Sequence, residues 1–218
     1  MSRSRAILPA GVAAALLANF WLLEDWLAER TDLSGSWISD LAARTQVYGW
    51  RFQLLEVASG LAVAGYAALL LRATGAWGRA SERGDGESAR LLRRGLLALL
   101  AAGILVAIGG AAPLNCAEAL ERACDLSYDP FDLVHSAANL FEIAAVAIAF
   151  ASVGLALLRT PQTRRLGQAT LAIGAAWLLL TACSGLSYPF DSIDSVKGLC
   201  QRGAQVLLGT WLLVLTRL

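Results

Sequence analysis

The stretch DLVHSAANLFE, residues 132–142, places four polar side chains at the start of an apolar run. They are Asp132, the chain's only histidine, His135, and then Asn139 and Glu142. At about 100° per residue, these four positions fall within an arc of about 80° on one helix. A histidine oriented by Asp132 could act as a general base, and a glutamate on the same face could act as an acid.

Two other apolar segments carry polar residues near their starts. RFQLLEVASG contains Gln53 and Glu56, and CQRGAQVLLG contains Arg202 and Gln205. Counted back from the arginines that end their helices, Glu56 and Glu142 both lie about 25 Å from the same edge. We therefore expect Arg202 to reach either glutamate. The predicted shared pocket is lined by Gln53, Glu56, His135, Asn139, Glu142, Arg202 and Gln205.

The elements that position these residues are predicted to be membrane-spanning helices. Hydrophobic residues make up 57% of the 218 residues and are grouped into segments of membrane-crossing length. A spanning helix needs about 20 apolar residues. The six predicted spans are residues 6–23, 52–71, 95–112, 136–158, 167–184 and 199–216.

The distribution of charge predicts how these spans are oriented. Most arginines fall at the two ends of the chain and in the segments after the second and fourth spans, which the positive-inside rule assigns to the cytoplasm. Most acidic residues fall on the other side. The sequence thus predicts an all-α membrane protein with a single domain over residues 1–218. It would form three out-and-back hairpins in a bacterial plasma membrane, with both termini cytoplasmic and the polar pocket near the outer face.

The four cysteines all map to the outer side of this arrangement. Cys116 and Cys124, within one loop, are predicted to form a disulfide in an oxidising compartment. Cys183 and Cys200 are the candidate second pair, and would clamp the next hairpin. Free, buried thiols are the alternative, and they are favoured more for the second pair than for the first.

Three functions and one structural role fit the polar cluster. The pocket could bind a lipid headgroup, a small amphiphile or a membrane partner, with Arg202 taking an anionic group. It could instead belong to an intramembrane hydrolase or transferase acting on an outer-leaflet lipid, with His135, Glu142, Glu56 and Asp132 as catalytic residues. Its carboxylates could also relay protons in a transporter. The structural alternative is a buried network of ion pairs and amides that holds the helices together.

Other site classes are disfavoured by the motifs. One histidine and the lack of HExxH and CxxC patterns argue against a metal site. The glycine patterns of nucleotide cofactors do not occur, nor does a basic aromatic surface for nucleic acid. We therefore expect no metal, no cofactor and no nucleic-acid partner.

Four short motifs carry a resemblance to a known family. They are SWISDLA after the first span, APLNC followed by a second cysteine, His135 at the start of the fourth span, and GLCQRGAQ at the start of the sixth. In this order they resemble a bacterial integral membrane family catalogued as a domain of unknown function, DUF998, which is similar to the DRAM and FRAG membrane proteins. The resemblance covers nearly the whole chain. It implies a six-helix bundle with outward polar loops and a link to lipid handling or signalling, and it assigns no catalytic residue.

Overall fold

The structure is a computed structural model that describes residues 4–28, 32–75, 86–121, 124, 129–186 and 195–218. These residues form helices, and none of them lies in a strand. The α-helices are α1 Ser4–Leu17, α2 Glu24–Leu27, α3 Gly49–Ala73, α4 Gly86–Ala111, α5 Pro130–Leu158, α6 Arg164–Gly185 and α8 Lys197–Val214. Short 3-10 helices are η1 Phe20–Leu23, η2 Ile38–Ala42, η3 Pro161–Thr163 and η4 Leu215–Arg217.

Four helices are long and apolar enough to cross a membrane: α3, α4, α5, and α6 together with η3. They confirm the predicted spans over residues 52–71, 95–112, 136–158 and 167–184. The predicted span over residues 6–23 is bent by 59° between Leu17 and Phe20, and it counts as a fifth crossing only if the bent pair is one span. The predicted span over residues 199–216 corresponds to α8, which does not reach the same apolar length because its first half carries Lys197, Gln201, Arg202 and Gln205.

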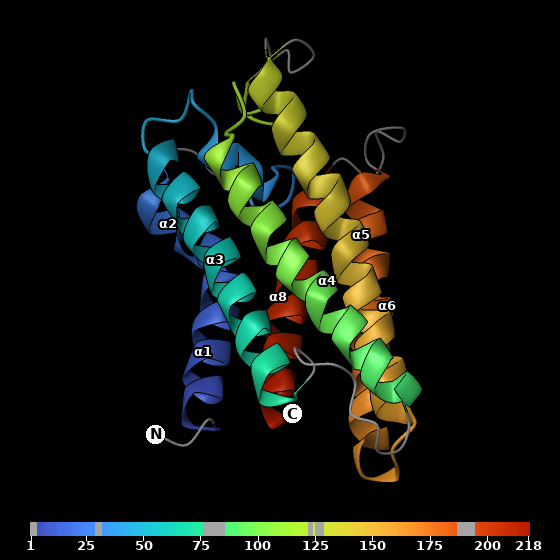
Figure 1. The fold of residues 1–218 in the computed structure, drawn as a ribbon. Helices are drawn as coiled ribbons and strands as arrows, with labels where there is room; N and C mark the ends of the chain where they lie inside the picture. Colours follow the sequence, from blue (N-terminus) through green and yellow to red (C-terminus); the bar gives the residue numbers. More distant parts are fainter. Residues whose placement is uncertain (1–3, 29–31, 76–85, 122–123, 125–128, 187–194) are drawn as a thin grey trace.

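The helices form one bundle in which α4 lies between α3 and α5, and α8 packs against α6 and α1 (Figure 1). Both ends of the chain lie at the same end of this bundle (Figure 1). That end also holds the arginines at the end of α3, the start of α4, the end of α5 and the start of α6. The other end holds α2, η2 and the start of α5 (Figure 1). We call these the basic end and the roof end.

Local sequence explains the start of α5 and the bend after α1. Asp129 is the N-cap of α5, where its carboxylate accepts the backbone N–H of Phe131 at 2.7 Å, and Pro130 occupies the first helical position. After α1, the side-chain amide of Asn19 donates to the carbonyl of Ala15 at 2.9 Å. Side chains that bond to a carbonyl four residues back favour bending of a helix. The bend carries the chain into η1 and α2 and directs Glu24 inward.

Small residues bring α3 and α4 into close contact. A Cβ added to Gly103 would lie 2.5 Å from the backbone nitrogen of Ala64 and 2.7 Å from the carbonyl oxygen of Gly60. Only glycine leaves room for this approach, as is common where membrane helices cross.

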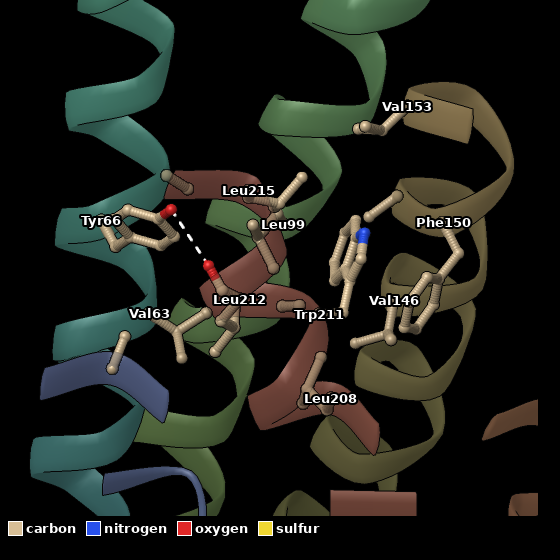
Figure 2. Close-up of a cluster of buried hydrophobic side chains, with 14 of the residues drawn as sticks. Val63, Tyr66, Leu99, Val146, Phe150, Val153, Leu208, Trp211, Leu212 and Leu215 are labelled. Carbon is tan, nitrogen blue, oxygen red and sulfur yellow. Dashed lines mark hydrogen bonds between the residues drawn. The ribbon is translucent and has the colours of Figure 1, made fainter. Parts of the chain in front are cut away.

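The apolar core fills the bundle on the basic side of the polar residues. Trp211 of α8 is fully buried, and its ring centroid lies 4.1 Å from that of Phe150 on α5 (Figure 2). The hydroxyl of Tyr66 on α3 donates to the carbonyl of Leu212 at 3.1 Å (Figure 2). Val146 and Leu208 belong to the same cluster, and they also line the deeper of the two cavities described below.

Both cysteine pairs lie at disulfide distance. Cys116 and Cys124 have a Cα–Cα separation of 5.6 Å, and Cys183 and Cys200 have one of 6.1 Å, both within the usual range for disulfides. The second bond ties the end of α6 to the start of α8. For this second pair, the separation agrees with the predicted disulfide rather than with the alternative of free thiols.

Candidate functional site

Two neighbouring cavities lie between the helices towards the roof end. The larger one has a volume of about 330 Å³ and is bounded by α5, α6, α8 and η2; we call it the large pocket. The other has a volume of about 70 Å³, reaches α3 and α4, and is called the small cavity. Five residues line both: Ser39, Asn139, Glu142, Gln201 and Gln205.

The residues on this shared wall come from three elements. Asn139 and Glu142 lie on α5, Gln201 and Gln205 lie one turn apart on α8, and Ser39 lies on η2. Residues four apart occupy the same face of a helix, so both glutamines point to the same side of α8. The wall therefore presents one carboxylate, three side-chain amides and one hydroxyl to the two cavities.

Glu56 lies in the small cavity together with Glu142. Its Oε2 atom is buried and has no hydrogen-bond partner in the structure. On its other side it packs against α4, where a Cβ added to Gly110 would lie 3.0 Å from the Cβ of Glu56. Two carboxylates thus face one enclosed space, which is an energetically demanding arrangement within a bundle of apolar helices.

His135 lines the large pocket and is held by α4 rather than by Asp132. Its Nδ1 atom lies 3.0 Å from the carbonyl oxygen of Gly109 and 3.2 Å from that of Ala112. Because carbonyl oxygens only accept hydrogen bonds, Nδ1 must carry the proton in these contacts. The Nε2 atom is buried and has no partner.

Asp132 makes its hydrogen bond to a loop rather than to His135. Its Oδ1 atom accepts the backbone N–H of Asn115 at 2.7 Å, and it lines neither cavity. The predicted orientation of His135 by Asp132 is therefore wrong, because the aspartate fixes the loop after α4. Gln53 is also outside both cavities, since its side-chain amide donates to the carbonyl of Ala42 at 2.9 Å.

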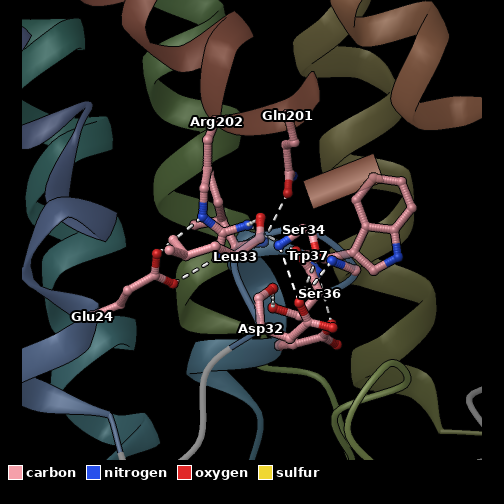
Figure 3. A network of polar contacts seen from close by, with 11 residues as sticks. Glu24, Asp32, Leu33, Ser34, Ser36, Trp37, Gln201 and Arg202 are labelled. Atoms are coloured by element: carbon pink, nitrogen blue, oxygen red, sulfur yellow. Dashed lines mark hydrogen bonds and ion pairs between the residues drawn. The ribbon is translucent and has the colours of Figure 1, made fainter. Parts of the chain in front are cut away.

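Arg202 makes a buried ion pair with Glu24 at the roof end (Figure 3). Its Nε atom donates to Oε1 of Glu24 at 3.1 Å and its Nη2 atom donates to Oε2 at 2.6 Å. Its Nη1 atom donates to the carbonyls of Leu33 at 3.1 Å and Ser36 at 2.9 Å. The two paired side chains are 3% and 2% exposed.

The prediction that Arg202 reaches Glu56 or Glu142 is therefore wrong. Arg202 follows Gln201 by one residue, so it projects about 100° away from the pocket-facing side of α8. The bend after α1 supplies Glu24 as its partner on that side. Arg202 lines neither cavity.

The segment from Leu33 to Ala42 is bound by Arg202 and Gln201 (Figure 3), and its residues 37–39 line the cavities. Besides the carbonyls bound by Arg202, the backbone N–H of Ile38 donates to Oε1 of Gln201 at 2.7 Å, and the N–H of Gly198 donates to the carbonyl of Ser34 at 2.7 Å. Trp37 lines the large pocket, and Ser39 lines both cavities. We call residues 33–42 the roof segment.

Asp40 closes the roof segment on itself. It is fully buried, and its Oδ2 atom accepts the backbone N–H of Trp37 at 2.8 Å. Burial raises the pKa of this carboxyl from 3.8 to about 6.

The large pocket reaches the outer surface of the bundle between α5 and α6. Leu140 lines it and is 66% exposed, and the lining residues Ser136 and Gly185 are exposed as well. Ile143 and Trp177 add apolar surface to its wall. The pocket thus joins a polar interior to a surface that faces lipid when the bundle spans a membrane.

Sequence reasoning missed Ser39, Gln201 and Glu24. Gln201 had a detectable signal, because it lies four residues before Gln205 in CQRGAQ. The position of Glu24 depends on the bend at Asn19, for which the hydrophobic pattern carries no signal. Among the described residues, no group of three or more His, Cys, Asp or Glu side chains is arranged to hold a metal ion.

Fold and site together define an all-helical protein with four or five helices apolar enough to cross a membrane, an internal polar pocket and a roof segment bound to α8. A family profile gives its membership: residues 10–218 match the profile of the family described as Protein of unknown function (DUF998), and the chain belongs to that family. Comparisons with curated proteins and with solved structures each found no significant match.

Proposed function

We propose that the protein crosses a bacterial plasma membrane six times, with both termini in the cytoplasm. α1 with η1 and α2 would form the first crossing, and α8 with η4 the last, because each connects the roof end to the basic end (Figure 1). The gathering of arginines at the basic end supports a cytoplasmic position for it. The roof end and its cavities would then lie at the outer leaflet.

In this orientation the large pocket binds the polar head of a membrane lipid or of a small amphiphile. The observation that carries the proposal is a pocket of about 330 Å³ with amide and carboxylate groups inside and the exposed apolar Leu140 at its edge. Ligand pockets begin at about 300 Å³, so this one suits a headgroup rather than a whole lipid. A membrane partner inserting a side chain would use the same opening.

Lipid mass spectrometry of the gently purified protein tests this proposal. Ser136→Trp places a large ring in an exposed lining position, whereas Leu133→Trp places the same ring at a position that is 73% exposed and does not line the pocket. We expect a species that is retained by the wild type and by Leu133→Trp and is lost from Ser136→Trp. Equal retention by all three proteins, or by none, would contradict the proposal.

One observation favours a second candidate, an intramembrane acid/base enzyme acting on an outer-leaflet lipid. His135 and Glu142 line the same pocket, and Nε2 of His135 has no partner. A general base needs such a free nitrogen close to its substrate. The wild type would then turn over a component of a lipid extract, and Glu142→Gln and Glu56→Gln would abolish this turnover while the protein still folds. A lipid extract whose composition is unchanged after incubation with the wild type would exclude this candidate.

A further inference from the structure

We propose that the large pocket recognises a primary ammonium group attached to an apolar chain, with Glu142 as its counter-ion. This inference rests on the proposed binding of a headgroup or amphiphile and adds the charge of the ligand. It replaces the anionic ligand that the sequence suggested, because that ligand depended on Arg202.

The residues around the cavities carry an excess of negative charge. Three lining residues are acidic: Glu56, Glu118 and Glu142. Within the part of the chain that the structure describes, no lysine or arginine lines either cavity. A cationic ligand would offset this excess of carboxylates.

Two of the described cations at the roof end, Arg202 and Lys197, each have an acidic neighbour that lies outside the pocket. Arg202 has both ends of its guanidinium occupied, by Glu24 and by two backbone carbonyls. Lys197 lies with its Nζ atom 5.5 Å from the ring centroid of Trp37, and its charge acts on Asp40. Among the described residues, an anionic headgroup in the large pocket would therefore meet the carboxylate of Glu142 and no lining lysine or arginine.

The large pocket also offers several hydrogen-bond acceptors. A primary ammonium has three N–H donors and no acceptor. The carboxylate of Glu142 and the amide oxygens of Asn139 and Gln205 line the same pocket from two facing helices. His135 adds a buried Nε2 atom without a partner, which is a fourth group able to accept.

The size and wall of the large pocket suit a small charged group on an apolar chain. Its volume equals roughly ten times the share of one molecule in liquid water, enough for an ammonium group and a few methylene groups. Leu140 and Ile143 on α5 continue the wall toward the exposed surface. The charged group would lie beside Glu142 while the chain leaves along these apolar side chains into the lipid.

Calorimetric titration of the protein in nanodiscs with octylamine, octanol and octyl phosphate tests the charge of the ligand, with empty nanodiscs subtracted. We expect octylamine to bind the wild type at least about tenfold more tightly than octanol, the effect of one charge-assisted hydrogen bond. Glu142→Gln should remove this preference. Glu87→Gln, which makes the same change at an exposed site on the basic end, should keep it.

The outcomes separate this inference from the proposed function. If the three compounds bind the wild type equally, or octyl phosphate binds best, the ammonium proposal is overturned while headgroup binding stands. If none binds saturably and no lipid is retained on purification, both fail. The wild-type comparison decides the matter even if Glu142→Gln does not fold.

A second arm identifies the source of the ammonium group. Nanodiscs containing phosphatidylethanolamine are compared with nanodiscs containing phosphatidylcholine, whose methylated nitrogen has no N–H donor. Weakened octylamine binding only in phosphatidylethanolamine indicates a lipid headgroup as the natural ligand. Unchanged binding in both indicates a free amine with an apolar chain.

Discussion

The ion pair between Arg202 and Glu24 gives the sharpest stability prediction. Both side chains are almost fully buried, and Glu24 accepts two of the hydrogen bonds that the guanidinium donates. Glu24→Gln keeps the shape of the side chain but leaves the cation without its counter-charge. Breaking a buried pair in this way costs about 3–5 kcal/mol, or roughly two to four powers of ten in the ratio of folded to unfolded protein.

A double-mutant cycle measures this effect, with free energies of unfolding obtained from SDS titration of the protein in micelles. Arg202→Gln leaves a buried carboxylate and should cost about as much, whereas the double variant contains two neutral amides and should be more stable than either single variant. Glu87→Gln breaks the exposed pair with Arg159 and serves as control, with no measurable loss expected. A loss for Glu24→Gln as small as that of the control, or additive losses in the double variant, would refute the reasoning.

Three further predictions concern the roof, the second disulfide and the helix crossing. Because the pKa of Asp40 is raised to about 6 in the folded protein, its protonated carboxyl stabilises the fold by about 3 kcal/mol below pH 3.8, and this contribution is lost as the pH rises through 6. The free energy of unfolding, measured across this range, should show this pH dependence in the wild type and lack it in Asp40→Asn. Replacing Cys183 and Cys200 by serine should cost about 3 kcal/mol for a 17-residue separation, and thiol labelling of the wild type before and after reduction checks that the bond exists. Gly103→Ala should cost about 1–3 kcal/mol because its Cβ would meet the backbone of α3, whereas Gly65→Ala, with nothing within 4 Å, should be neutral or slightly stabilising in the same unfolding assay.

Hydropathy was sufficient to predict the long helices and the level at which two glutamates lie. Glu56 and Glu142 are at the same depth because each is a fixed number of 1.5 Å rises from an arginine that ends its helix. The small cavity contains both. Distance along a helix follows directly from the sequence, which is why this part of the site was predictable.

The direction in which Arg202 points was not predictable in the same way. A pocket shared by several helices depends on how each one is rotated about its axis, and an error of one residue turns a side chain by about 100°. Arg202 was predicted in the pocket because of its charge, whereas its neighbour Gln201 lines the pocket in the structure. The partner of Arg202 depends on a bend in the first helix that follows from the contact of Asn19 with Ala15. Such a bend belongs to tertiary structure, and an apolar run does not reveal it.

The roof segment constrains the protein by its length as well as by its composition. Within four consecutive residues, the carbonyl of Ser36 binds Arg202, the N–H of Ile38 binds Gln201, and Ser39 lines both cavities. Inserting or deleting one amino acid here would shift every later group out of register with α8, even if all the original side chains were kept. Variation among members of the family should therefore take the form of substitutions in this segment, with gaps confined to the chain on either side of it.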